Sequence, residues 1–350
     1  MKKPAILILL MTILAMVFLA GCQDNQEAKK EQTLKDFKVG YLPTPGHVLY
    51  FIAQEKGFFQ EAGLKVELFQ FNNSGEGLNA VKSGKIDAGS FGTAAPLAFI
   101  AKGADFTIFG GQQSEGHGLI AKPEKAEGFK DLKNLKGKTI ATVRLATGDV
   151  VLRGTLLEQG IDWKKDLKVI ELDSPAAVLE AVKKGNVDAG VVWTPYIKMA
   201  EDQGLQIVKY SGDMLKSHAC CRQVALTSKI EENPQDYEKF MTALIKAYAF
   251  YQTNQDETVD IISIYVKIDQ EIIKAETYGG HIHSIPDPNK AGVQKFWDFM
   301  NKAGYISSDL NIDDHINTDI YQHALANLLK QEPNNKIYQE LEEHFHQDNK

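Results

Sequence analysis

Two stretches of the chain are nearly identical, AVKSGKIDAG at residues 80–89 and AVKKGNVDAG at residues 181–190. They stand 101 positions apart and agree at seven of ten places. Gly84 and Gly185 fall where a helix ends and the backbone needs the left-handed region that glycine tolerates. The apolar residues that follow predict a buried strand. A helix end, a turn and a strand that recur in this way predict two lobes built on one plan.

The elements around each stretch also recur in the same order. Strand-like runs alternate with helical patterns from Phe37, and the order restarts near residue 137. This alternation predicts an α/β fold with sheets covered by helices on both faces, in which one βαβαβ unit is used twice. The strand-like runs are FKVGYL, LKVELFQF, IDAGSF and DFTIFGG in the first set, and GKTIATVRL, LKVIELD, VDAGVVW and LQIVKY in the second.

The C-terminal third of the chain has a helical pattern. Phe240, Leu244, Ala247 and Tyr251 recur at helical spacing, which predicts a buried stripe and not a cofactor site. Residues 336–350 are mostly polar, and we expect a solvated tail there.

Charge and cysteine usage argue against a nucleic-acid-binding protein and against a disulfide-stabilised scaffold. The net charge of −7 comes from intermingled acidic and basic residues, so we expect no nucleic-acid partner. Apart from Cys22, the cysteines are the adjacent Cys220 and Cys221. Because structural disulfides usually join distant segments, the fold must be held by its apolar core.

The N-terminus has the pattern of an export signal. Lys2 and Lys3 precede the uncharged apolar run from Ala5 to Ala20, which is short for a membrane span of roughly 20 residues. The run ends in LAGC, which looks like a bacterial lipobox. We therefore predict a lipoprotein signal peptide at 1–21, lipidation of Cys22 and a polar tether at 22–36. The protein would be held by lipid on the extracytoplasmic face of the cell membrane.

Several motifs, in order, resemble one family. They are KVGYLP, IAQEKGFFQEAGLKVEL, AVKSGKIDAG, DLKNLKGKTIAT and the later KAGYI. Over about residues 37–325 the chain resembles the substrate-binding lipoproteins of ABC importers of the nitrate, sulfonate and taurine class, whose fold is shared with thiamine-pyrimidine-precursor binding proteins. The resemblance implies a two-lobed periplasmic-binding-protein type II fold, the venus flytrap, with lobe two inserted into lobe one.

This resemblance sets the expected domains and partners. Lobe one would comprise residues 37–118 and, as a helical completion, 223–335, and lobe two residues 119–222. The protein would act as a monomer that captures a small solute in the interlobe cleft and delivers it to the transmembrane subunits of an ABC permease.

Ligands of open α/β sheets bind beyond the carboxyl ends of parallel strands, where helix N-termini favour anions. Polar residues at these ends are our candidate ligand contacts, and Thr93 and Thr194 should face one another across the cleft. Arg144 and Arg222 are two of only three arginines, and a guanidinium can bind a carboxylate or sulfonate through two hydrogen bonds. The predicted ligand-binding residues are Thr44, Pro45, His47, Ser74, Gly92, Thr93, Gln112, Ser114, Arg144, Thr147, Asp149, Trp193, Thr194, Tyr196 and Arg222.

The segment SHACCRQ contains an unusual group of His218, Cys220 and Cys221. A soft-metal site or a vicinal disulfide is conceivable. Adjacent side chains on a strand point to opposite faces, however, so we expect one cysteine to be buried and the other at the cleft rim. The pairs in HIH (281–283) and HFH (344–346) lack a third ligand and should be solvated. We expect no bound metal and no cofactor.

The leading functional hypothesis is therefore a solute receptor for a small anion, not an enzyme. The sequence has no GxSxG elbow, no HExxH and no phosphate-binding glycine loop. One alternative is a binder of an uncharged heterocycle, such as a thiamine pyrimidine precursor or a flavin. Alternatives of another class are a pyrimidine-synthase-like enzyme and a Cys/His metal-binding lipoprotein.

Overall fold

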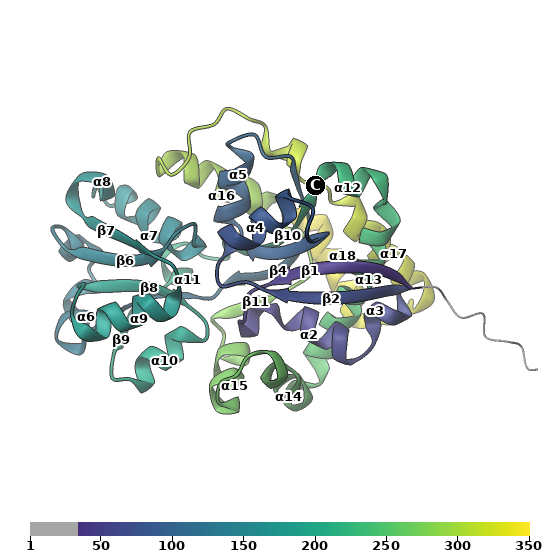
Figure 1. Cartoon of the computed structure of the whole chain (residues 1–350), viewed down its shortest axis with the longest axis horizontal. Helices are drawn as coiled ribbons and strands as arrows, with labels where there is room; N and C mark the ends of the chain where they lie inside the picture. Colours follow the sequence, from purple (N-terminus) through teal and green to yellow (C-terminus); the bar gives the residue numbers. More distant parts are fainter. Residues whose placement is uncertain (1–33) are drawn as a thin grey trace, which may run out of the picture. The chain divides into compact units, whose positions relative to one another are not determined.

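The computed structural model describes residues 34–350. The predicted signal peptide, the lipidation site Cys22 and nearly all of the tether lie outside these residues. Within the described residues the strands form two sheets (Figure 1). From Leu34 to Lys350 there is no helix with the length and apolar character needed to cross a membrane.

The first sheet has the strand order β11-β4-β10-β3-β1-β2. β1 is parallel to β2 and β3, whereas β10 is antiparallel to both β3 and β4. This sheet and the helices packed on it form lobe one. Its strands are β1 (Lys35–Tyr41), β2 (Leu64–Gln70), β3 (Ala88–Gly92), β4 (Phe106–Glu115), β10 (Ala219–Leu226) and β11 (Ile282–Ser284).

The second sheet, the centre of lobe two, has the order β7-β6-β8-β5-β9. β6 is parallel to β7 and β8, and β5 is antiparallel to β8 and β9. Because β10 returns to the first sheet after the whole second sheet, lobe two is inserted into lobe one, and the predicted fold is confirmed. The strands are β5 (His117–Ala121), β6 (Thr139–Val143), β7 (Lys168–Leu172), β8 (Ala189–Trp193) and β9 (Gln206–Tyr210).

The sheets exchange strands slightly earlier than the predicted boundaries at 118/119 and 222/223. His117 already belongs to the second sheet, and Ala219 already belongs to the first.

The repeated ten-residue stretch makes the same contacts in both lobes. Gly84 and Gly185 have φ of 68° and 75°, as a left-handed helix end requires. The repeated aspartates then accept a backbone N–H at the first strand of their βαβαβ unit. Lys38 N donates to Asp87 Oδ2 over 2.7 Å, and Thr139 N donates to Asp188 Oδ2 over 2.9 Å. The stretch is therefore scaffold, since it ties the third strand of each unit to the first.

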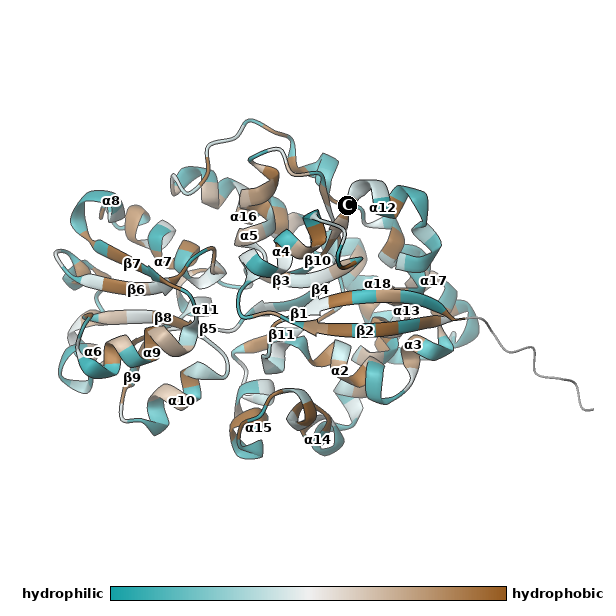
Figure 2. Ribbon diagram, viewed as in Figure 1, coloured by the Kyte–Doolittle hydropathy of each residue, from teal (hydrophilic) through white to brown (hydrophobic). Residues whose placement is uncertain are grey.

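Apolar clusters lie on both faces of each sheet. Figure 2 shows apolar residues on strands of both sheets. The predicted stripe of Phe240, Leu244, Ala247 and Tyr251 is buried on the longest helix, α13. Lobe one has η1 (Pro45–His47), α2 (Val48–Glu55), α3 (Phe58–Glu61), α4 (Ser74–Lys82), α5 (Ala94–Ile100), α12 (Thr227–Glu232), α13 (Pro234–Thr253), α14 (Gln255–Tyr265), α15 (Gln270–Tyr278), α16 (Lys290–Lys302), η3 (Ile312–His315), α17 (Asp319–Gln331) and α18 (Lys336–Asp348). Lobe two has α6 (Pro123–Phe129), η2 (Leu132–Leu135), α7 (Thr147–Glu158), α8 (Trp163–Asp166), α9 (Pro175–Lys184), α10 (Tyr196–Asp202) and α11 (Ser211–Met214).

The prediction of a solvated tail over residues 336–350 is wrong. The segment forms α18, and Tyr338, Leu341 and Phe345 are buried on one side of it. Asn349 then donates from Nδ2 to Asp287 Oδ1 over 2.8 Å. Three apolar residues at helical spacing suffice to dock an otherwise charged helix. The histidines on either side of Phe345 are exposed.

Docking of α18 predicts a stability effect for Phe345→Ala. The Phe345 ring lies 5.8 Å from that of Tyr321, centroid to centroid. Truncating a buried phenylalanine should lower the free energy of unfolding by about 3 kcal/mol. The exposed Glu342→Ala on the same helix should change it little, and urea unfolding of both variants measures this. Equal stability of the two variants would show that α18 does not pack on the body.

Candidate functional site

Two crossings connect the lobes, and they are hydrogen-bonded to one another. Glu115 and Ser217 stand at the crossings with φ of 61° and 57°, a region that non-glycine residues seldom adopt. Ser217 N donates to Glu115 Oε1 over 2.7 Å, and Glu115 N donates to the His218 carbonyl over 3.2 Å. The crossings therefore form one paired hinge, about which the lobes can rotate.

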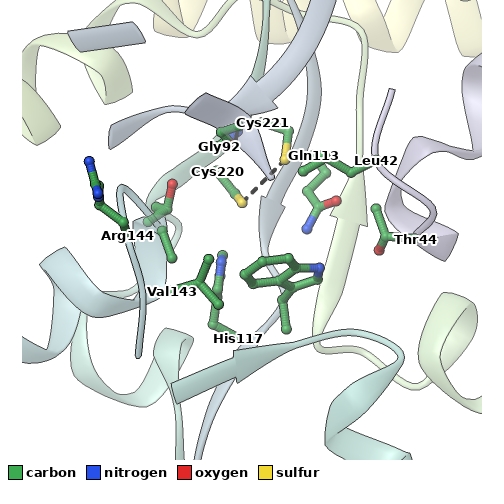
Figure 3. Close-up of a pocket in the computed structure, with 13 residues that line it drawn as sticks. Leu42, Thr44, Gly92, Gln113, His117, Val143, Arg144, Cys220 and Cys221 are labelled. Carbon is green, nitrogen blue, oxygen red and sulfur yellow. Dashed lines mark hydrogen bonds between the residues drawn. The ribbon is translucent and has the colours of Figure 1, made fainter. Parts of the chain in front are cut away.

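A small cavity lies between the lobes beside this hinge (Figure 3). Its volume is about 30 Å³, measured over the positions that the centre of a water-sized sphere can occupy. By that measure it holds only a few waters. The lining residues are Leu42, Thr44, Ser74, Gly92, Gln113, His117, Val143, Arg144, Ala146, Thr147, Trp193, Cys220 and Cys221.

The structure brings some of the predicted contact residues to this cavity and places others behind it. Contact with a solute stays a prediction for all of them. Those that line the cavity are Thr44, Ser74, Gly92, Arg144, Thr147 and Trp193. Those absent from the lining are Pro45, His47, Thr93, Gln112, Ser114, Asp149, Thr194, Tyr196 and Arg222.

Threonines around the cavity hold the two lobes together. Thr44 Oγ1, in lobe one, donates to the carbonyl of Thr194, in lobe two, over 2.9 Å. Ala94 N, in lobe one, donates to Thr147 Oγ1, in lobe two, over 3.3 Å. Thr93 and Thr194 are both fully buried at this junction. Several small polar residues at the strand ends therefore bridge the lobes directly.

Asp149 is held by an arginine instead of facing the cavity. Arg153 Nε donates to Asp149 Oδ1 over 2.8 Å, and the guanidinium lies 4.3 Å from the Trp163 ring centroid. Burial raises the pKa of Asp149 to about 6, although Arg153 opposes the shift. The guanidinium also lies 5.4 Å from the centroid of the Tyr305 ring, so this buried pair lies where α7 packs against lobe one.

Arg222 is also an interior residue, with an exposed fraction of 0%. Its Nη1 donates to the carbonyls of Gln113 and Cys221 over 2.9 and 2.8 Å. Burial lowers the pKa of Arg222, and the nearby Asp287 carboxylate opposes that shift. The guanidinium therefore supports β4 and β10 from behind the cavity.

The prediction that one cysteine would be buried and the other at the cleft rim is wrong, since both line the cavity. Strand alternation fails here because the pairing of β10 with β4 shifts register on both sides of Cys221. His117 also lines the cavity although it was not predicted, and Gln113 lies in the lining between the strand-end candidates Gln112 and Ser114. β5 and β10 run antiparallel to their neighbours, so their amino ends lie at the cleft. Our prediction considered only the carboxyl ends of parallel strands and therefore missed residues at these amino ends.

Burial and neighbouring groups set the protonation of these side chains. Burial, and next the neighbouring His218, lower the pKa of His117 to about 3, so its imidazole is neutral at physiological pH. The hydrogen bond with Cys220 lowers the pKa of Cys221 although burial opposes that shift, and burial raises the pKa of Cys220 well above its usual value.

Below the hinge, α15 of lobe one meets α10 of lobe two. Lys198 N, in the first turn of α10, donates to Glu276 Oε1 over 2.7 Å. Nearby, the rings of Tyr210 and His281 stack with centroids 3.5 Å apart. Burial raises the pKa of Glu276 from 4.5 to about 7, partly opposed by the Lys198 N–H and increased by Glu201. These contacts join lobe one directly to lobe two.

This contact predicts that closure depends on pH. In the open form Glu276 is solvated, with an ordinary pKa, so the closed form binds its proton more tightly. Closure should therefore strengthen, by roughly tenfold or more, as pH falls from about 7 toward 4.5, and should not change further below that. Energy transfer between fluorophores on the two lobes measures the closed fraction. Glu276→Gln should remove this pH dependence, whereas the exposed Glu271→Gln on the same helix should preserve it.

Comparison with known proteins places the chain in a family. Residues 30–265 match the model of the NMT1-like family. A putative aliphatic sulfonates-binding protein of Bacillus subtilis is 25% identical over 90% of this chain and 96% of its own length. The 4-amino-5-hydroxymethyl-2-methylpyrimidine phosphate synthase of Aspergillus parasiticus is 27% identical over 60% of this chain and 64% of its own.

The fold has solved counterparts. The periplasmic nitrate-binding protein NrtA of Synechocystis aligns with a TM-score of 0.72 at 19% identity, covering 84% of this chain and 89% of that one. It shares the two-lobed binding-protein fold described above. On the match over residues 30–265, this chain is a member of the NMT1-like family.

Proposed function

We propose that this chain is the solute-binding protein of an ABC importer and that it captures a small anion in the interlobe cavity. The observation that carries the proposal is the cavity itself. Residues from both lobes line it, and the lobes are joined by one paired hinge beside it. A solute that contacts both lobes would stabilise the closed form, which a permease can distinguish from the open form.

Several features of the cavity wall favour a negatively charged solute. Ser74 is the first residue of α4 and Thr147 the first of α7, so two helix N-termini meet at the cavity. Their free N–H groups and dipoles attract negative charge. The lining includes the cation Arg144 and contains no Asp or Glu. The Arg144 side chain is 77% exposed and lies 3.7 Å from Glu171, so it can turn toward a ligand.

The relatives agree with this charge preference. The Bacillus relative is named for aliphatic sulfonates and the Synechocystis neighbour for nitrate. We propose a solute of this class for the present chain. A planar heterocycle is the second candidate, because the Trp193 indole in the wall could stack on a ring.

Membrane attachment is part of the proposal and depends on the sequence of the N-terminus. The LAGC motif supports lipidation of Cys22 after removal of residues 1–21. A lipid anchor would keep the receptor beside its permease on the extracytoplasmic face.

The proposal predicts anion binding that depends on Arg144. Isothermal titration of the purified protein with alkanesulfonates, taurine and nitrate should identify a ligand that, at 100 times its dissociation constant, adds about 2.7 kcal/mol of stability. Arg144→Ala should weaken it by roughly tenfold to a hundredfold, and Arg144→Lys by less. Lys85→Ala, an exposed cation elsewhere on lobe one, should bind like the wild type. Absence of binding across the panel, with thiamine pyrimidines and flavins included, would refute the proposal.

The anchor is tested separately with Cys22→Ala. Loss of the acylated cysteine should move the protein from the membrane fraction to the soluble fraction or leave it as an unprocessed precursor. Fractionation with radiolabelled palmitate measures both. A Cys22→Ala protein that still carries label would disprove lipidation at this residue.

A further inference from the structure

β10 carries a β-bulge at its two cysteines. Ala219 pairs with Ser114 and Cys221 pairs with the adjacent Gln113, so Cys220 is an extra residue without a partner on β4. The Cys220 carbonyl instead accepts hydrogen bonds from Thr93 N and Thr93 Oγ1. Bulges redirect side chains and recur beside functional sites. This one turns two neighbouring side chains to the same side of the strand.

The two thiols consequently converge on the cavity. Their sulfurs lie 3.5 Å apart, and both residues are buried, with exposed fractions of 1% for Cys220 and 5% for Cys221. A regular strand would have separated them by pointing one to each face. Figure 3 shows both sulfurs in the cavity wall.

A third donor lies in the same wall. His117 is buried, and its Nδ1 has no hydrogen-bond partner among residues 34–350. Figure 3 shows His117 in the same cavity wall as the two cysteines. No three His, Cys, Asp or Glu side chains of the described chain are yet close enough to form a complete metal centre. The thiols therefore offer two ligands and leave other positions open.

We propose that Cys220 and Cys221 bind a thiophilic d10 cation such as Zn²⁺ or Cd²⁺, and that this cation anchors the anionic solute. Thiolates prefer such ions. Two metal–sulfur bonds of about 2.3 Å at a tetrahedral angle hold their sulfurs about 3.8 Å apart, so the pair needs only a small shift. Each thiol that binds as thiolate releases its proton to solvent, and no electron is transferred.

The solute would bind the cation at the coordination positions that the two thiolates leave unoccupied. Two thiolates neutralise a divalent ion, and Arg144 and the N-termini of α4 and α7 then favour a negatively charged ligand beside it. This inference rests on the proposed function only in that the cavity is taken as the solute site.

The first test is a Cd²⁺ titration of the purified, reduced full-length protein, followed by thiolate-to-cadmium charge-transfer absorption. We expect one Cd²⁺ per chain, at least tenfold weaker binding in Cys220→Ser and in Cys221→Ser, and loss of the absorption in the double alanine variant. Cys22 is retained in every variant. The control with His344→Ala and His346→Ala, which removes two exposed imidazoles, should bind like the wild type. Cadmium binding that is absent from the wild type, or unchanged in the double alanine variant, overturns the site.

Cadmium-113 NMR of the wild-type protein tests the same site without a substitution, so its result does not depend on whether a variant folds. A chemical shift typical of two sulfur ligands is expected, and a shift typical of none or of one overturns the site.

The second test separates this inference from the proposed function. Sulfonates and nitrate are titrated into metal-free and Cd²⁺-loaded protein, and the anchor predicts at least tenfold tighter binding to the loaded form. By reciprocity the anion must tighten Cd²⁺ binding by the same factor. Equal anion affinity for both forms overturns the anchor and leaves the proposed function standing. Stoichiometric Cd²⁺ binding without any anion binding supports the metal site and refutes the proposed function.

Discussion

The pairing of β10 between β3 and β4 is the interaction on which the rest of the structure depends. It returns the chain to the first sheet and so makes lobe two an insertion. It also brings the second crossing beside the first, where Ser217 and Glu115 form the hinge. Arg222, buried behind the strand, holds the carbonyls of Gln113 and Cys221. Burying a guanidinium costs free energy unless its hydrogen-bond partners are held in place. The hydrogen bonds that Arg222 makes to β4 and β10 therefore fix the position of β10 and of the cavity wall at the same time.

Much of the fold could be predicted from the sequence because it follows local rules. The repeat, the glycine turns and the stripe on α13 each reflect a spacing that is visible in the chain. The repeated aspartates show why the ten-residue stretch recurs, since Asp87 and Asp188 both tie a strand to its neighbour. The C-terminal helix α18 was missed because Tyr338, Leu341 and Phe345 are few among charged residues, and only their partners in the core explain their burial.

The candidate site was less predictable, because its members come from pairing between distant strands. Residues at carboxyl ends of parallel strands, such as Ser74 and Trp193, were found by a simple rule. His117 stands at the amino end of an antiparallel strand, and the two cysteines share one wall only because of a bulge. Register and bulges depend on the partner strand, which a single segment of sequence does not specify.

The insertion of lobe two also constrains the order in which the chain can fold. The second sheet is contiguous, from His117 to Tyr210, whereas the first sheet needs β10 and β11 from beyond it. During synthesis β1 to β4 emerge first, yet β3 and β4 do not pair with one another and join one sheet only when β10 lies between them. Lobe two can therefore complete its sheet while lobe one is still open. The lobe that the chain begins first is the lobe that it finishes last.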